Sequence, residues 1–142
     1  MITYVDTSTL IKLIVEEGGS ARAEVIWQSA DSVASESLVV VEARAALAAA
    51  ARSGRLSSEQ LRAAQTELRA FVGDLHLVDV TESLIETAAE LAEAEALRGY
   101  DAVHLAAALF VDATVLTSAD QDLCAAAARQ GLHIADPLAR PR

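Results

Sequence analysis

The sequence predicts a single α/β domain with a parallel sheet, spanning residues 1–142 and ending in a tail over residues 136–142. Three observations predict this fold class. Short β-branched and aromatic runs alternate with longer segments in which apolar residues recur at helical spacing. Strands that alternate with helices require right-handed crossovers, which make neighbouring strands parallel. The length of 142 residues, 53% of them hydrophobic, suits one compact core.

The expected elements follow one another without a linker. Five strands are expected, over residues 2–5, 32–35, 75–80, 114–117 and 132–135. Seven helices are expected between them, over residues 8–15, 20–30, 38–53, 58–72, 82–97, 101–111 and 120–130. Ser57 and Gln60 form a capping-box pattern, and Thr81 can cap the following helix. Three glycines stand where helices are expected to end: Gly54, Gly73 and Gly131.

Composition excludes several classes of protein. No apolar run approaches the roughly 18 residues that span a bilayer, and the first residues carry no secretion-signal pattern. We therefore expect a soluble, cytoplasmic protein without a membrane partner. The single cysteine, Cys124, excludes an internal disulfide. A net charge of −10 argues against broad electrostatic attraction to nucleic acid. A local basic surface is nevertheless predicted from five arginines: Arg44, Arg52, Arg55, Arg62 and Arg69.

Asp6 and Glu42 are acidic residues at unusual places for this fold class. Asp6 ends the first expected strand, and open α/β sheets bind ligands beyond the carboxyl ends of their strands. The hydroxyls of Thr7 and Ser8, which follow it, can hydrogen-bond a carboxylate or a water there. Glu42 interrupts an apolar helical face, so its carboxylate must be paired, protonated or bound to a metal. The alternatives are helix capping by Asp6 and an ion pair between Glu42 and an arginine.

A second group of polar residues lies in the C-terminal half of the chain. Asp101 opens a helix that is apolar on nearly every side, where capping is the alternative to a binding role. His104, one turn later, is expected to be a hydrogen-bonded core residue rather than a ligand. The segment S-A-D-Q-D-L supplies Ser118, Asp120 and Asp122 after the fourth expected strand. Asp120 is the better candidate, because Asp122 points about 200° around the helix from it.

Four acids are therefore expected at one rim of the sheet: Asp6, Glu42, Asp101 and Asp120. Carboxylates about 5 Å apart repel by about 3 kcal/mol per pair at an effective dielectric constant near 20. A divalent cation would offset this repulsion. Because no histidine or cysteine is expected among the acids, their chemistry favours Mg²⁺, with Mn²⁺ as a substitute, over Zn²⁺.

The motifs D-T-S-T-L, R-G-Y-D-A-V-H-L-A-A-A-L and S-A-D-Q-D-L, together with the helical Glu42, resemble the PIN domain, and most closely the VapC toxins of bacterial toxin–antitoxin pairs. The resemblance covers essentially the whole chain. It implies a parallel sheet of four or five strands in the order 3-2-1-4-5, with helices on both faces. The family's acidic and metal-binding positions fall on Asp6, Glu42, Asp101 and Asp120, with Ser8 and Ser118 as supporting hydroxyls and Asp122 competing with Asp120.

By the same resemblance, we expect a Mg²⁺-dependent endoribonuclease, the toxin of a VapBC-type pair, that cleaves RNA phosphodiester bonds to inhibit translation and growth. Its expected partners are a VapB-like antitoxin, the RNA substrate and a second copy of the chain. The alternatives are a housekeeping PIN-like nuclease and a non-catalytic PIN-like module that acts through protein contacts. A phosphoacceptor receiver domain is excluded because the only lysine, Lys12, lies in the first expected helix.

The segment over residues 38–72 is expected to form two helices joined at residues 53–57. It carries apolar residues that a small domain could leave uncovered: Val39, Val40, Leu56, Leu61 and Leu68. Surplus apolar surface predicts an interface, and by the resemblance this helical hairpin would grip the antitoxin. The alternative is that all of these residues pack inside.

Overall fold

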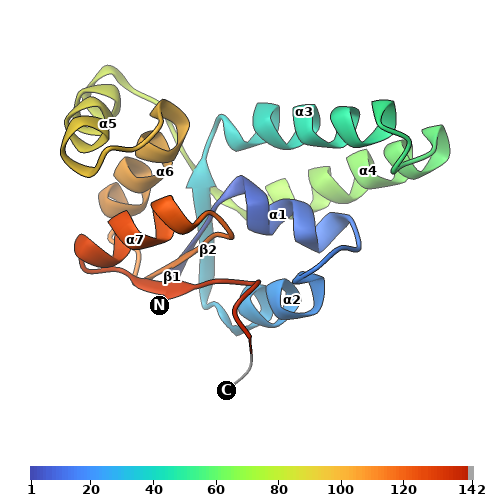
Figure 1. Ribbon diagram of the computed structural model, residues 1–142, viewed down its shortest axis with the longest axis horizontal. Helices are drawn as coiled ribbons and strands as arrows, with labels where there is room; N and C mark the ends of the chain where they lie inside the picture. Colours follow the sequence, from blue (N-terminus) through green and yellow to red (C-terminus); the bar gives the residue numbers. More distant parts are fainter. Residues whose placement is uncertain (141–142) are drawn as a thin grey trace.

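The structure of the protein, a computed structural model, describes residues 1–140 (Figure 1). Residues 141–142 of the expected C-terminal tail lie outside the described residues. The rest of the tail lies against the domain. Asp136 accepts hydrogen bonds from two side chains, through its backbone oxygen from Arg22 Nε at 3.0 Å and through Oδ2 from Gln121 Nε2 at 2.9 Å.

Five parallel strands form the sheet, in the order β3-β2-β1-β4-β5. The strands are β1 (Ile2–Val5), β2 (Ser32–Glu36), β3 (His76–Val78), β4 (Val115–Thr117) and β5 (His133–Ala135). This confirms the expected sheet. The observed strands agree with the expected ones to within one residue at each end, except that β3 ends two residues earlier than expected. Val5 is paired with Thr117, so the residues that follow β1 and β4 emerge side by side at the carboxyl edge.

Seven helices connect and cover the strands within the described part of the chain. They are α1 (Thr7–Ile14), α2 (Ser20–Ser29), α3 (Val39–Arg52), α4 (Ser58–Asp74), α5 (Glu82–Glu95), α6 (Gly99–Phe110) and α7 (Gln121–Arg129). The expected capping box of Ser57 and Gln60 is present, and Thr81 caps α5. Gly54 and Gly131 follow helix ends with φ of 83° and 93°. Gly73 lies inside the last turn of α4, so its expected role as a stop signal is wrong.

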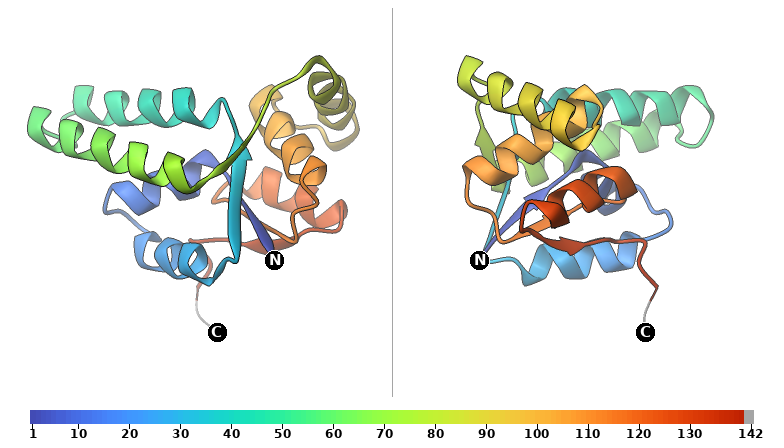
Figure 2. Two further views of the ribbon diagram at one scale, coloured as in Figure 1. Left: turned by 180° about the vertical axis from the view of Figure 1, so that it is seen from behind. Right: turned by 60° about the vertical axis from the view of Figure 1, so that its left-hand side comes forward.

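The helices cover both faces of the sheet (Figure 2). Alternate residues of each strand point to opposite faces, so Tyr4 packs in one core and Val5 in the other. The first core contains residues of α5, α6 and α7. The second contains residues of α1, α3 and α4, with Trp27 of α2 at its border. The sheet is therefore the middle layer, and its carboxyl edge is left for the polar residues that follow the strands.

The hairpin of α3 and α4 carries less free apolar surface than the sequence indicates. Val39 and Leu68 are buried in the second core, and Val40, Leu56 and Leu61 are partly buried against it. The expectation that these residues form a surplus apolar surface is therefore wrong. The reason is that α3 packs against both α1 and α4, so these neighbouring helices cover its apolar residues. All five arginines of this segment are exposed: Arg44, Arg52, Arg55, Arg62 and Arg69.

Across residues 1–140, none of the helices has both the length and the apolar character that crossing a bilayer requires.

Candidate functional site

Asp6 is the centre of a hydrogen-bond network at the carboxyl edge of the sheet. It directly follows β1 at the start of α1, and its side chain is 8% exposed. Its Oδ2 accepts hydrogen bonds from Ser8 Oγ at 2.8 Å and from Ser118 Oγ at 2.7 Å. Ser118 emerges beside it because β4 is paired with β1. The alternative, side-chain capping of α1 by Asp6, does not occur.

The two serines also connect this network to the segment after β4. Ser118 Oγ accepts a hydrogen bond from the backbone N–H of Asp120 at 3.0 Å, and Ser8 Oγ accepts one from the N–H of Ala119 at 3.0 Å. Each hydroxyl therefore donates to Asp6 and accepts from the backbone. This arrangement fixes the orientation of the Asp6 carboxylate relative to the start of α7.

Glu42 lies in the first turn of α3 and reaches across to α1. Its Oε2 accepts a hydrogen bond from Thr7 Oγ1 at 3.1 Å, whereas its Oε1 is buried and has no hydrogen-bond partner. Burial raises the pKa of this carboxyl, but His104, together with hydrogen bonds that involve Glu36 and Thr7, outweighs burial and lowers it. Within residues 1–140 the cation beside Glu42 is thus a histidine, and the alternative of an arginine ion pair does not occur.

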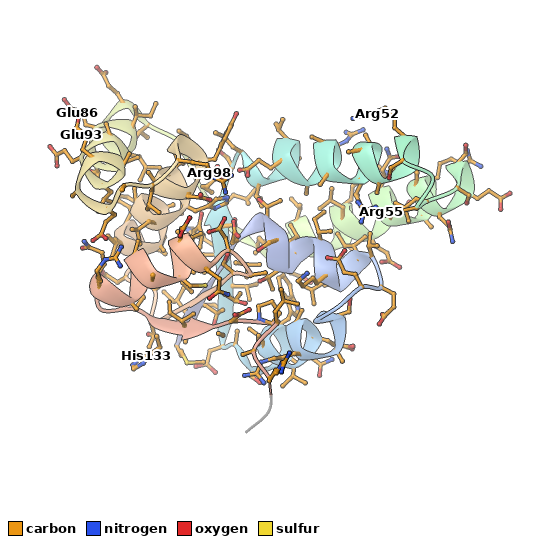
Figure 3. The ribbon with its side chains drawn as sticks, in the orientation of Figure 1. Arg52, Arg55, Glu86, Glu93, Arg98 and His133 are labelled. Atoms are coloured by element: carbon orange, nitrogen blue, oxygen red, sulfur yellow. The ribbon has the colours of Figure 1, made fainter. Side chains whose placement is uncertain are left out.

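Asp101 and Asp120 share one arginine, Arg98, which lies at the N-terminus of α6 (Figure 3). Arg98 Nε lies 3.3 Å from Asp101 Oδ2, and its Nη2 lies 3.0 Å from Asp120 Oδ2. Burial, Asp120 and Asp6 raise the pKa of Asp101, partly offset by Arg98. Because both Asp6 and Asp120 act on Asp101, the three acids share one region of negative charge.

Asp120 and Asp122 differ clearly in their surroundings. Asp120 caps α7 by accepting a hydrogen bond from the N–H of Leu123 through Oδ1, which leaves its Oδ2 directed to Arg98. Asp122, in the first turn of the same helix, is exposed. The geometry therefore favours Asp120 over Asp122 as the acid that faces Asp101.

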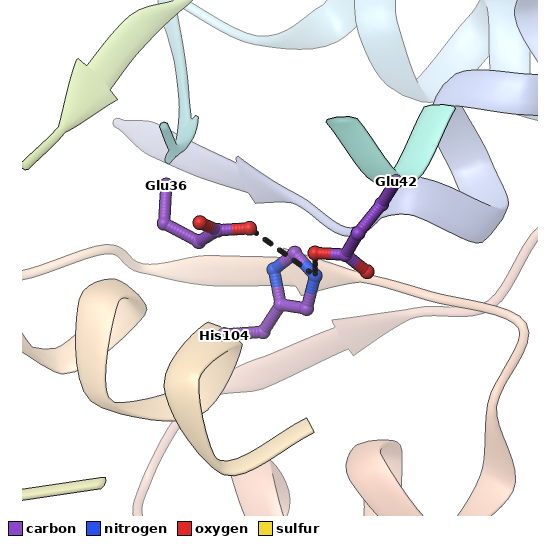
Figure 4. A group of neighbouring side chains, drawn as sticks. All are labelled: Glu36, Glu42 and His104. Atoms are coloured by element: carbon purple, nitrogen blue, oxygen red, sulfur yellow. Dashed lines mark ion pairs between the residues drawn. The ribbon is translucent and has the colours of Figure 1, made fainter. Parts of the chain in front are cut away.

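His104 lies among these acids, which the sequence did not indicate (Figure 4). Its side chain is 1% exposed, and its Nε2 lies 3.2 Å from Asp6 Oδ1, 3.3 Å from Glu42 Oε1 and 3.7 Å from Glu36 Oε1. The Nδ1 atom lies 2.8 Å from Tyr4 Oη, so the expectation of a hydrogen-bonded core histidine is confirmed. The expectation that no imidazole accompanies the acids is wrong.

Glu36, the last residue of β2, is a buried acid that sequence reasoning missed. It is fully buried, and its Oε1 has no hydrogen-bond partner, whereas Oε2 accepts one from the N–H of Leu38. Burial raises the pKa of Glu36 to about 7, although His104 acts in the opposite direction. Burial lowers the pKa of His104, but Glu42, Asp6 and Glu36 together raise it to about 9. The rule that singled out Asp6, an acid at the carboxyl end of a strand, would also have found Glu36.

A cavity of about 740 Å³ lies between α5 and α6 and borders Glu42 and Asp101. Its wall is mainly apolar, with Ala88, Ala92 and Val103, and Arg98 and Tyr100 also line it. The cavity therefore gives a path from the surface to the carboxylates.

The arrangement fits a divalent cation. Buried carboxylate oxygens ordinarily have hydrogen-bond partners, whereas Glu42 Oε1 and Glu36 Oε1 have none within the described chain. Hard divalent cations prefer carboxylate oxygens of this kind. The residues that could hold such an ion are Asp6, Glu42, Asp101 and Asp120, and Glu36 and His104 lie beside Glu42 with ligand atoms close enough to contribute.

Comparison with known proteins places the chain in a family. The family model of the PIN domain matches residues 3–129. The chain belongs to the PIN-domain family. It is similar to ribonucleases VapC45 and VapC49 of Mycobacterium tuberculosis (strains CDC 1551 / Oshkosh and ATCC 25618 / H37Rv), with 42% identity over 110 residues in each case. These matches cover 78% of this chain and 76% of each relative.

Solved structures show the same fold. Mycobacterium tuberculosis VapC20, described as a Sarcin-Ricin loop cleaving toxin, has a TM-score of 0.70 and 20% sequence identity, with 98% of this chain and 99% of that chain covered. VapBC2 from Rickettsia felis, solved with a DNA fragment from its promoter, has a TM-score of 0.67 and 15% identity, with 96% and 98% covered. The expected PIN-like fold and the resemblance to VapC proteins are thereby confirmed.

Proposed function

We propose that this PIN-domain protein is a Mg²⁺-dependent endoribonuclease that acts as the toxin of a VapBC-type pair. The observation that carries the proposal is the gathering of acids from separate elements at one edge of the sheet, with a buried carboxylate oxygen of Glu42 left without a partner. The 42% identity to two VapC ribonucleases supports the reaction class.

Asp6, Glu42, Asp101 and Asp120 would hold the ion. When bound, Mg²⁺ polarises the phosphate and lowers the pKa of an attacking water. The protein's own contribution is orientation, because Ser8 and Ser118 hold Oδ2 of Asp6 while its Oδ1 lies 3.2 Å from His104 Nε2. Thr7 fixes Glu42 through Oε2 in the same way. Asp6 and Glu42 are therefore positioned before the ion and the substrate arrive, which reduces the cost of ordering them.

Exposed arginines would hold the RNA backbone. Arg98 lies at the edge of the acids and lines the cavity, so its guanidinium can pass from the carboxylates to a phosphate when a metal ion compensates the carboxylates. The five exposed arginines of α3 and α4 offer further phosphate contacts, including Arg52 and Arg55 at the far end of the hairpin (Figure 3). A local basic surface of this kind overcomes the unfavourable net charge of −10.

A VapB-like antitoxin and a second copy of this chain are the proposed partners. The support is the likeness to VapC proteins and, at the level of fold, to a VapBC2 assembly. Pull-down of a co-expressed antitoxin from a neighbouring reading frame, with light scattering of the purified chain alone, tests both partners. A monomeric chain without an antitoxin partner would favour a housekeeping nuclease.

The test of the nuclease uses a matched pair of variants on α7. Asp120→Asn removes a proposed metal ligand, whereas Asp122→Asn removes the same charge from an exposed position two residues away. We expect Asp120→Asn to reduce Mg²⁺-dependent cleavage of a fluorescent single-stranded RNA by at least 100-fold, and Asp122→Asn to leave cleavage within about threefold of wild type. Equal activity of the two variants would contradict the site, and cleavage that survives chelation would contradict the metal.

A further inference from the structure

Four potential ligand atoms converge beside the buried Oε1 of Glu42. They are His104 Nε2, Asp6 Oδ1, Glu36 Oε1 and Glu42 Oε1, and the last three lie 3.2, 3.7 and 3.3 Å from His104 Nε2. The ligand atoms that Glu36, Glu42 and His104 offer all lie within 4.8 Å of one another. Ligands that bind one ion at about 2.0–2.2 Å cannot be more than about 4.4 Å apart. Small side-chain rotations are therefore enough to bring these atoms around one ion.

Two of these oxygens have no hydrogen-bond partner. Glu36 is fully buried, its Oε1 is directed toward His104 (Figure 4), and neither this atom nor Glu42 Oε1 accepts a hydrogen bond. Buried carboxylate oxygens without partners are rare in folded proteins, because burial removes the water that would otherwise solvate them. The cation beside these oxygens is His104, but its Nε2 carries a single proton and cannot donate to all the carboxylates around it. A divalent cation in place of that proton would contact them together.

Tyr4 fixes the orientation of the histidine ring. Its Oη lies 2.8 Å from His104 Nδ1 and accepts a hydrogen bond from the backbone N–H of Glu36 at 3.1 Å. The two rings meet edge to face, with centroids 5.7 Å apart. Because Nδ1 is held by Tyr4, Nε2 must face the carboxylates. Metal-binding histidines are commonly oriented in this way through their second nitrogen.

We propose that Glu36, Glu42 and His104 form a second cation site that takes a first-row transition metal, Zn²⁺ or Mn²⁺, with Asp6 at its rim. The proposal deepens the nuclease function, because it shares Glu42 with the Mg²⁺ position near Asp101. The two positions differ in chemistry. An imidazole nitrogen favours transition metals, whereas the position near Asp101 offers oxygen atoms alone. Of the residues of the second site, Glu42 borders the cavity of about 740 Å³.

Metal binding tests the proposal without RNA. We expect Zn²⁺ titrated calorimetrically into the metal-free full-length protein to bind at least 10-fold more weakly to Glu36→Gln than to wild type. The matched control is Glu95→Gln, which removes a carboxylate of α5 that pairs with Arg129 of α7. This control should bind Zn²⁺ as tightly as wild type. Circular dichroism and thermal unfolding establish that both variants are folded.

A spectroscopic measurement tests whether a nitrogen of His104 binds the metal ion. Electron spin-echo spectra of the Mn²⁺-loaded wild-type protein should show coupling to a directly bound ¹⁴N nucleus, and His104→Gln should abolish it. If His104→Gln does not fold, the wild-type spectrum and the Glu36→Gln titration decide the matter.

Two results would overturn the proposal. One is equal Zn²⁺ affinity of wild type and Glu36→Gln, and the other is a wild-type Mn²⁺ spectrum without nitrogen coupling. Neither result depends on cleavage, so an RNA-cleaving wild type that fails both tests would retain the nuclease function and lose only the second site.

Discussion

Ser118→Ala should weaken both the fold and the metal site, because the Ser118 hydroxyl makes one buried and one partly buried hydrogen bond. It donates to Asp6 Oδ2 at 2.7 Å and accepts from the N–H of Asp120 at 3.0 Å, and the residue is fully buried. A hydrogen bond to a charged group contributes about 1.5–3 kcal/mol, and a buried N–H left without a partner costs about 1 kcal/mol or more. We therefore expect the free energy of unfolding to fall by about 2.5–4 kcal/mol.

The same substitution should loosen Asp6, which would keep only the hydrogen bond from Ser8 on Oδ2. Removing a group that orients a metal ligand commonly costs about 10–100-fold in metal affinity or activity. The midpoint of the Mg²⁺ titration of RNA cleavage should therefore rise by about this factor.

Urea unfolding followed by circular dichroism measures the first effect, and cleavage of a fluorescent RNA over a range of Mg²⁺ concentrations measures the second. Ser29→Ala is the matched control, because the Ser29 hydroxyl bonds only the carbonyl of Val25 on an exposed helix surface. Its stability should stay within about 0.5 kcal/mol of wild type. If Ser118→Ala has the same stability and Mg²⁺ dependence as wild type, the reasoning about Asp6 is refuted.

Three further predictions concern other parts of the molecule. Burial raises the pKa of the Cys124 thiol to about 11. Alkylation at pH 8–9, followed by mass spectrometry, should therefore modify the unfolded chain but not the folded one. Because the thiol ionises at lower pH in the unfolded chain, the free energy of unfolding should decline as pH rises from about 9 toward 11. Arg98→Ala should tighten Mg²⁺ binding measured by calorimetry, because the guanidinium competes with the ion for Asp101 and Asp120. Arg129→Ala, which removes the partner of Glu95, should leave Mg²⁺ affinity unchanged. Equal Mg²⁺ affinities of the two variants would contradict this competition. Leu47 is fully buried, so Leu47→Ala should lower the free energy of unfolding, measured in urea, by about 2–5 kcal/mol. Val41 is 64% exposed, so Val41→Ala should change it by less than about 0.5 kcal/mol. Similar effects of the two substitutions would contradict the core assignment.

The sequence by itself determined the fold class and much of the rim. Strand and helix periods are local properties, so the sequence alone shows the alternation of elements and the capping patterns at Ser57 and Thr81. Asp6 and Asp120 could be placed at the same edge because each follows a strand, and parallel strands end at the same edge. The roles of these acids in catalysis stay predictions.

Only the tertiary structure decided which residues surround the acids. His104 lies in an apolar helical segment, and its local sequence is the same whether its ring meets a carbonyl or a carboxylate. The meeting with Glu36, Glu42 and Asp6 depends on α6 packing against the strand that ends in Glu36, and on α3 packing against α1. The burial of apolar residues on α3 and α4 was decided in the same way. Such contacts join residues far apart in the chain, so they depend on how the helices pack on the sheet, which no local pattern encodes.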